Sequence, residues 1–210
     1  MSLPTLESFL KDVAAHKLTV NLDQGVLRDL TVKRPNTSSF HYNITTRSGY
    51  LIITGDMGSF VFQRLTDMFD FFRSDNDQYH INDGYWEEKL EAVCRRGGAK
   101  SFSSDRVEEI LLDELNQFKQ ELSRSNSDKQ KLKAAKEEID SLISLASDSE
   151  HDFYAEISNW DSDCSGGLSL DNWWEWDFTE YTYHYIWCLY AIVHAIKLYD
   201  AYKSEQGEVQ

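Results

Sequence analysis

The chain has 210 residues, which is enough for one domain or for one domain with a helical appendage. Its formal net charge of −15 argues against direct binding to nucleic acid, because contacts with phosphates need clusters of Lys and Arg. A hydrophobic fraction of 41% and an aromatic fraction of 13% argue against a chain that is disordered throughout.

No targeting or membrane segment is expected. Residues 1–13 lack a basic region followed by an apolar one, so they do not resemble a signal peptide. The longest apolar run, residues 185–195, is far shorter than the roughly 20 residues that span a bilayer. The three cysteines, Cys94, Cys164 and Cys188, are widely spaced and form no zinc-binding pattern, which favours a reducing compartment inside the cell. We therefore expect a cytoplasmic protein without membrane contact.

Alternating apolar and polar residues in the first hundred positions predict an antiparallel sheet. The predicted strands lie at residues 18–22, 28–34, 40–46, 50–54 and 59–64, with turns rich in Gly, Asp and Asn between them. Helical patterns begin at residue 4, cover residues 67–73 and extend from residue 82 to residue 96. The predicted fold class is α+β, with an N-terminal antiparallel sheet of about five strands and packed helices over residues 1–100.

A mainly helical C-terminal region is expected over residues 101–210, joined to the sheet region in one compact unit. Helices are predicted over residues 106–122, 127–146 and 148–160, and a long buried helix over about residues 174–203. The 127–146 helix has a narrow apolar stripe that suits pairing with a second copy, so a homodimer is one predicted association.

The negative charge is concentrated in residues 137–196, which contain thirteen carboxylates and no Lys or Arg. Such a run usually keeps a protein soluble, but this one also holds five of the six Trp residues. Because Trp commonly anchors interfaces, the stretch predicts a partner-binding surface. Its predicted members are Asp148, Glu150, Asp152, Glu156, Trp160, Asp161, Asp163, Trp173, Glu175 and Asp177.

A loop over residues 161–172 has the spacing of an EF-hand calcium loop. Asp161, Asp163, Ser165 and Ser169 place oxygens at its first, third, fifth and ninth positions, and Gly166 occupies the position of the sharp turn. Asn172 replaces the bidentate Glu at the twelfth position, which weakens any such site. The alternative is a loop whose side chains cap its own backbone. We expect no cofactor, with Ca²⁺ at this loop as the alternative.

An enzyme that degrades or modifies a nucleotide or a defence signal is the alternative function. Its pocket would lie near the Gly-Asp-Met-Gly turn at residues 55–58, with Asp56, or near Glu180 and His184, which are four residues apart in the predicted last helix. A turn between strands and a carboxylate–imidazole pair on a helix surface are the simpler interpretations. We predict no catalytic residue.

Two motifs carry a resemblance to a family. GDMGSFVFQR at residues 55–64, followed by DMFDFFR at residues 67–73, resembles accessory proteins of bacteriophages, prophages and plasmids, and WDF at residues 176–178 and YIWC at residues 185–188 extend the likeness. The resemblance implies an anti-defence protein, such as an anti-CRISPR inhibitor, in the cytoplasm of a bacterial host cell. With the acidic stretch, it predicts a non-enzymatic nucleic-acid mimic that binds and occludes a basic, nucleic-acid-binding surface of a host defence complex.

Overall fold

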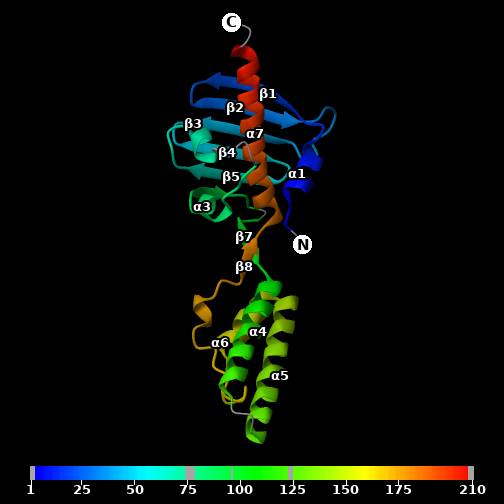
Figure 1. Ribbon diagram of the computed structural model, residues 1–210, viewed down its shortest axis with the longest axis vertical. Helices are drawn as coiled ribbons and strands as arrows, with labels where there is room; N and C mark the ends of the chain where they lie inside the picture. Colours follow the sequence, from blue (N-terminus) through cyan, green and yellow to red (C-terminus); the bar gives the residue numbers. More distant parts are fainter. Residues whose placement is uncertain (1–2, 74–78, 96, 123–124, 208–210) are drawn as a thin grey trace. The chain divides into compact units, whose positions relative to one another are not determined.

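The computed structural model describes residues 3–73, 79–95, 97–122 and 125–207 (Figure 1). The chain divides into two compact units. Unit 1 consists of residues 1–100 and 181–210, and unit 2 consists of residues 101–180. This division differs from the expected one, because the last helix belongs to the sheet-containing unit and not to a helical region over residues 101–210.

Unit 1 is built on a six-stranded antiparallel sheet whose strands follow sequence order. The strands are β1 (Lys17–Gln24), β2 (Leu27–Lys33), β3 (Tyr42–Arg47), β4 (Tyr50–Gly55), β5 (Gly58–Gln63) and β6 (Leu90–Val93). The first five confirm the predicted strands, and the α+β class is confirmed with them. Buried and less buried side chains alternate along β2 to β5, as expected for a sheet covered on one face.

The sixth strand replaces most of the helix predicted over residues 82–96. Only the short helix α3 (Asp83–Glu87) forms there, and Leu90 and Val93 then pair with Phe62 and Phe60 of β5. The pairing provides hydrogen-bond partners for the backbone groups on the outer edge of β5. A helix at this position would leave that edge unpaired. Arg96 lies outside the described residues.

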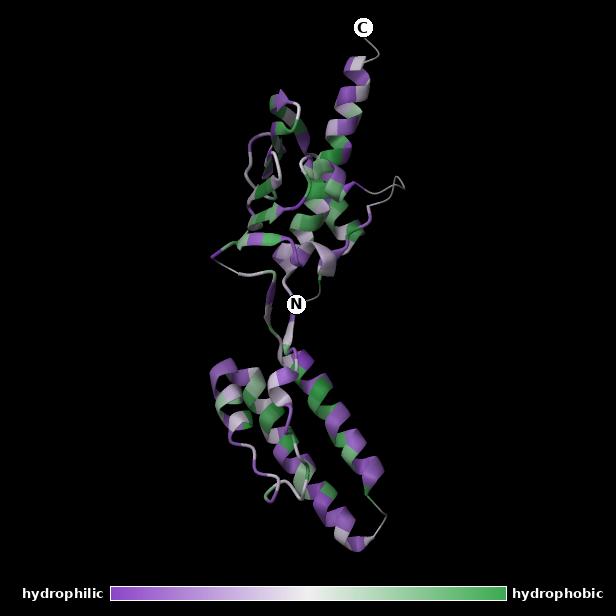
Figure 2. Ribbon diagram, turned by 90° about the vertical axis from the view of Figure 1, so that its left-hand side faces the viewer, coloured by the Kyte–Doolittle hydropathy of each residue, from purple (hydrophilic) through white to green (hydrophobic). Residues whose placement is uncertain are grey.

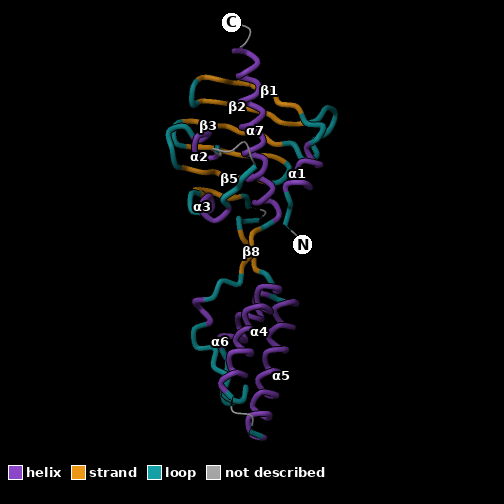
Figure 3. The backbone as a smooth tube through the Cα atoms, in the orientation of Figure 1, coloured by secondary structure: helices purple, strands orange, loops and turns teal. Residues whose placement is uncertain are grey.

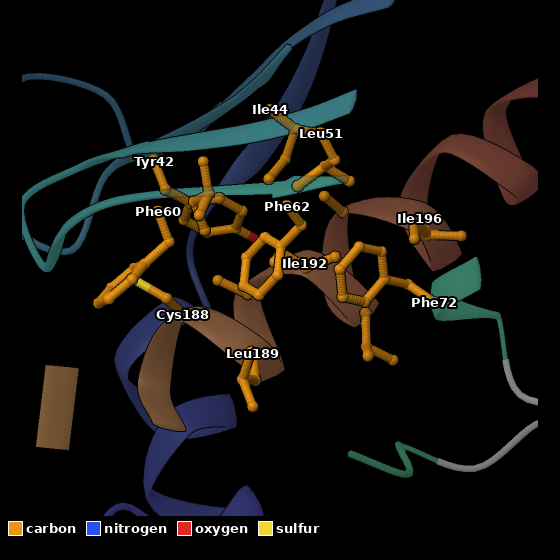
Figure 4. Packing of buried hydrophobic residues seen from close by; sticks show 14 of the residues in the cluster. Tyr42, Ile44, Leu51, Phe60, Phe62, Phe72, Cys188, Leu189, Ile192 and Ile196 are labelled. Atoms are coloured by element: carbon orange, nitrogen blue, oxygen red, sulfur yellow. The ribbon is translucent and has the colours of Figure 1, made fainter. Parts of the chain in front are cut away.

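Helix α7 (Tyr183–Gly207) crosses the sheet, beside the short helix α1 (Leu6–Val13) (Figure 1). It is apolar along its middle and more hydrophilic towards its C-terminal end (Figure 2). Phe60 and Phe62 of the sheet lie in one buried cluster with Ile192 of α7 (Figure 4). The apolar helix therefore covers the apolar face of the sheet, which explains why it packs there. None of the helices in the described ranges is long and apolar enough to span a membrane.

Two buried polar interactions connect elements of unit 1. The hydroxyl of Tyr42 and Nδ1 of His194 are 2.6 Å apart and share a hydrogen bond, and burial lowers the pKa of His194 to about 4, so the imidazole is neutral at neutral pH. Arg28 donates two hydrogen bonds to Asp67, at 2.8 and 2.7 Å. Asp67 also accepts the backbone N–H of Phe69 and so caps helix α2 (Met68–Phe72).

Unit 2 contains three helices, α4 (Ser104–Glu121), α5 (Asn126–Asp148) and α6 (Glu150–Ser158), which confirm the predicted ones. A 3₁₀ turn, η1 (Trp173–Glu175), follows a long loop. Strands β7 (Lys100–Phe102) and β8 (Thr179–Tyr181) pair in a two-stranded sheet where the chain enters and leaves this unit (Figure 3). In the α5 stripe that suggested a homodimer, Ala135, Ile139 and Leu142 are buried in the core of unit 2, Leu132 and Ile143 are partly buried, and the homodimer stays a prediction.

Candidate partner-binding surface

Unit 2 carries almost all of the net charge. Residues 101–180 contain seven Lys and Arg and twenty Asp and Glu, a formal charge of −13, which leaves −2 for the remaining 130 residues. The basic residues of unit 2 all lie between residues 106 and 136, so residues 137–180 contribute thirteen negative charges and no Lys or Arg. Summed charges of one sign produce a potential that extends beyond individual contacts.

All thirteen carboxylates of residues 137–180 are exposed to solvent. They include the eight predicted to bind a partner, which lie at the end of α5, on α6, in the loop after it and around η1: Asp148, Glu150, Asp152, Glu156, Asp161, Asp163, Glu175 and Asp177. The ion pairs of Lys133 with Glu137 and of His151 with Asp152 are themselves exposed. Surface pairs of this kind are solvated and weak, so they leave the acidic character of the unit in place.

The Trp residues of unit 2 differ in accessibility. Trp160 donates its indole N–H to the carbonyl oxygen of Leu168 at 2.9 Å. Trp160 and Trp173 are both partly buried and pack against the core of unit 2. Trp174, which the sequence did not single out, is 64% exposed. Of the two predicted anchors neither is fully accessible, and Trp174 is better placed to enter a partner surface. Trp173 and Trp174 differ in exposure because of the 3₁₀ turn η1. The predicted helix from about residue 174 did not include this turn.

The calcium-like loop uses its oxygens mainly on its own backbone. Asp161 accepts the N–H of Asp163 at 2.9 Å, and the buried hydroxyl of Ser165 lies within hydrogen-bonding distance of three backbone carbonyls. The described parts of the chain contain no group of three or more His, Cys, Asp or Glu side chains placed to hold a metal ion. Ser169 is exposed. This arrangement fits the alternative of a self-capped loop, and the expected absence of a cofactor stays a prediction.

Gly166 fixes this loop against α5. Its φ angle is +67°, and a Cβ atom added there would lie 2.4 Å from the carbonyl oxygen of Lys131. Every residue other than glycine would therefore meet both backbone strain and a steric clash. The glycine that resembled a metal-loop signature is explained by packing within unit 2.

Unit 1 contains a second candidate site, a cavity of about 350 Å³ lined by residues 55–59, Cys94, Gly97 and His184. It brings together the Gly-Asp-Met-Gly turn and His184, which were predicted as alternative pockets. Asp56 accepts the backbone N–H of Phe40 at 2.8 Å and so fastens the turn to the preceding loop. The cavity has the size of a small-molecule site, with a thiol and an imidazole in its wall.

The predicted Glu180/His184 pair does not form on a helix. Glu180 lies in β8 and accepts a hydrogen bond from the hydroxyl of Ser103 at 2.7 Å. Helix α7 begins only at Tyr183, so the two side chains do not have helical spacing of four residues. The prediction was wrong because Thr179–Tyr181 forms β8, which pairs with β7, and the last helix begins only after this strand.

Comparison of the chain with protein-family models gave no match, and comparisons with curated proteins and with solved structures gave none either. The functional argument therefore rests on the charge, exposure and packing of the residues described above. Of the two candidate sites, the acidic surface has the larger departure from ordinary protein composition. Folded proteins generally intersperse charges of both signs on their surfaces.

Proposed function

We propose that this protein is a non-enzymatic inhibitor whose unit 2 binds a basic, nucleic-acid-binding surface of another protein and occludes it. The observation that carries the proposal is the charge of −13 over 80 residues, with every carboxylate of residues 137–180 exposed. Lys and Arg side chains of the partner, which otherwise contact phosphates, would then pair with Asp and Glu. Unit 2 would act as a nucleic-acid mimic.

Charge and apolar contact would have different roles in this complex. Exposed carboxylates at the rim of an interface mainly accelerate association and make it sensitive to salt. A stable interface of ordinary size also needs about 800 Å² buried on each partner and a few well-packed anchors. Trp174, 64% exposed within the acidic segment, supplies an anchor of the residue type most often found at such positions.

The partner class follows from the resemblance to phage, prophage and plasmid accessory proteins. We propose a host defence complex in the bacterial cytoplasm, inhibited in the manner of anti-CRISPR proteins. In this proposal the protein binds no nucleic acid or membrane itself and needs no cofactor. The resemblance is an argument by source, whereas the basic character of the partner is argued from the charge.

A charge-neutralised variant tests the proposal. Asp148→Asn, Glu156→Gln, Asp163→Asn and Glu175→Gln together remove four exposed carboxylates, none of which caps the N-terminus of α4, α5 or α6. The intact tagged protein and the variant are used to capture proteins from a nuclease-treated bacterial lysate. We expect the intact protein to retain a nucleic-acid-binding protein, and the variant to lose it.

The matched control removes the same number of charges from unit 1, through Glu7→Gln, Glu88→Gln, Glu91→Gln and Glu205→Gln, all at exposed positions. This control should retain the captured protein, because the acidic surface of unit 2 is intact. Equal capture by the unit 2 variant and the control would show that the carboxylates of unit 2 do not direct binding, and the proposal would be wrong.

The cavity of unit 1 favours a second candidate, an enzyme acting on a nucleotide or a nucleic-acid-linked signal. Cys94 and His184 are side chains of the types that serve as nucleophile and base, and both line the cavity. Turnover of a cyclic nucleotide by the purified protein, lost in Cys94→Ser or His184→Ala, would favour this candidate. Absence of turnover, together with loss of partner capture in the unit 2 variant, would exclude it in favour of the inhibitor.

A further inference from the structure

A shallow groove on α6 lies within the acidic surface of unit 2. It has a volume of about 460 Å³ and is lined by Glu150, His151, Tyr154 and Ala155. These residues occupy one face of the helix, while Phe153 and Ile157 on the other face are buried in the core. The lining thus combines the ring of Tyr154 and the methyl group of Ala155 with a carboxylate and an imidazole.

Further aromatic rings lie next to Tyr154, beyond the residues that line the groove. The ring centroid of Tyr154 is 6.3 Å from that of Trp173, and Trp173 is 6.3 Å from Trp174. Tyr154 and Trp173 are partly buried, so their rings are held by the core, whereas Trp174 is 64% exposed. A planar side chain entering here would meet aromatic surfaces whose positions are already set.

Two carboxylates act on the same tyrosine. Burial raises the pKa of Tyr154, and the negative charges of Glu150 and Asp177 raise it further. Glu150 lies one helical turn before Tyr154 on α6 and lines the groove with it, whereas Asp177 follows η1. Aromatic rings flanked by carboxylates form a surface suited to a cation.

We infer that the groove lined by Glu150, His151, Tyr154 and Ala155, with Trp173 and Trp174 beside it, takes an arginine side chain of the partner. This inference rests on the proposed function, in which the partner is basic. A guanidinium is planar, stacks on aromatic rings and pairs with carboxylates through two parallel hydrogen bonds. A lysine ammonium is compact and strongly hydrated, so it loses more on entering an apolar groove. The groove accordingly selects arginine over lysine.

Two homopeptides of equal length and charge, one of arginine and one of lysine, test the selectivity. Each is titrated into the intact protein by calorimetry at low ionic strength. We expect the arginine peptide to bind about two- to fivefold more tightly, the range that stacking of a cation on an exposed aromatic ring provides. In Trp174→Ala and in Glu150→Gln, both changes at exposed positions, this ratio should fall towards one.

The matched control is Glu138→Gln, which neutralises an exposed carboxylate on α5, outside the groove. It should weaken both peptides equally and leave the ratio unchanged. Equal binding of the two peptides by the intact protein, or a ratio that persists in both groove variants, would overturn the arginine site while leaving the acidic docking surface standing. Failure of both peptides to bind would contradict the proposed function as well.

Discussion

Acidification should destabilise unit 1 through one buried imidazole. His194 lies on α7, is 9% exposed and is hydrogen-bonded to Tyr42 of β3. Its ring also packs near those of Phe9 and Tyr79. Burial, and to a smaller extent the nearby charge of His16, lowers the pKa of His194 from 6.5 to about 4. The neutral ring is therefore the form that the folded unit accepts.

The sign and size of the effect follow from the two pKa values. Because the folded value lies below the unfolded one, the contribution to stability is complete above about pH 6.5 and is lost as the pH falls towards about 4. The full difference corresponds to about 3 kcal/mol of unfolding free energy. Between about pH 7.5 and about pH 5, the loss expected from this residue alone is about 2 kcal/mol.

Hydrogen exchange of the β3 and β4 amides, corrected for the intrinsic effect of pH, measures this loss in unit 1. For amides that exchange by unfolding of the unit, protection should fall about thirtyfold at the lower pH. His194→Gln keeps an acceptor for the Tyr42 hydroxyl but does not titrate, so its protection should depend less on pH. Parallel pH profiles for the two proteins would refute the assignment of the effect to His194.

Three further predictions concern single features. Arg28→Met leaves the part-buried carboxylate of Asp67 without its bidentate partner and should cost about 1–3 kcal/mol, part of which Arg28→Met/Asp67→Asn should restore in thermal unfolding. Gly166→Ala should destabilise unit 2 by about 1–3 kcal/mol or more. The loss should exceed that of Gly167→Ala, because only a Cβ atom at residue 166 clashes with the backbone. Equal losses of unfolding free energy in the two variants would contradict this explanation. Calorimetric titration with Ca²⁺ should give no heat, because the loop at residues 161–172 is capped by its own side chains; saturable heat would favour the calcium site.

The sequence predicts elements whose signal is local. Strands β1 to β5 were recognised from alternation, and α4 to α6 from helical periodicity and capping residues. Strand β6 was missed because four residues, Leu90–Val93, become a strand only through pairing with β5. The division into units was missed for the same reason, since the pairing of β7 with β8 joins segments far apart in the chain.

For the acidic surface of unit 2, some features could be predicted from the sequence and others could not. Exposure of the carboxylates could be predicted, because ionised Asp and Glu are rarely buried without partners. The exposure of individual Trp residues could not be predicted from the sequence. It depends on the hydrogen bond of Trp160 to Leu168 and on the 3₁₀ turn in which Trp174 is exposed. The groove on α6 depends on the placement of Tyr154 against the core, which sequence spacing does not specify.

Competition with nucleic acid tests the central claim most directly. A partner captured by the intact protein is loaded with fluorescently labelled duplex DNA or RNA, and this protein is added while anisotropy is followed. We predict complete displacement of the nucleic acid, weaker at high salt and absent for the variant that lacks the four carboxylates of unit 2. A ternary complex, in which the nucleic acid stays bound while this protein also binds, would contradict the account.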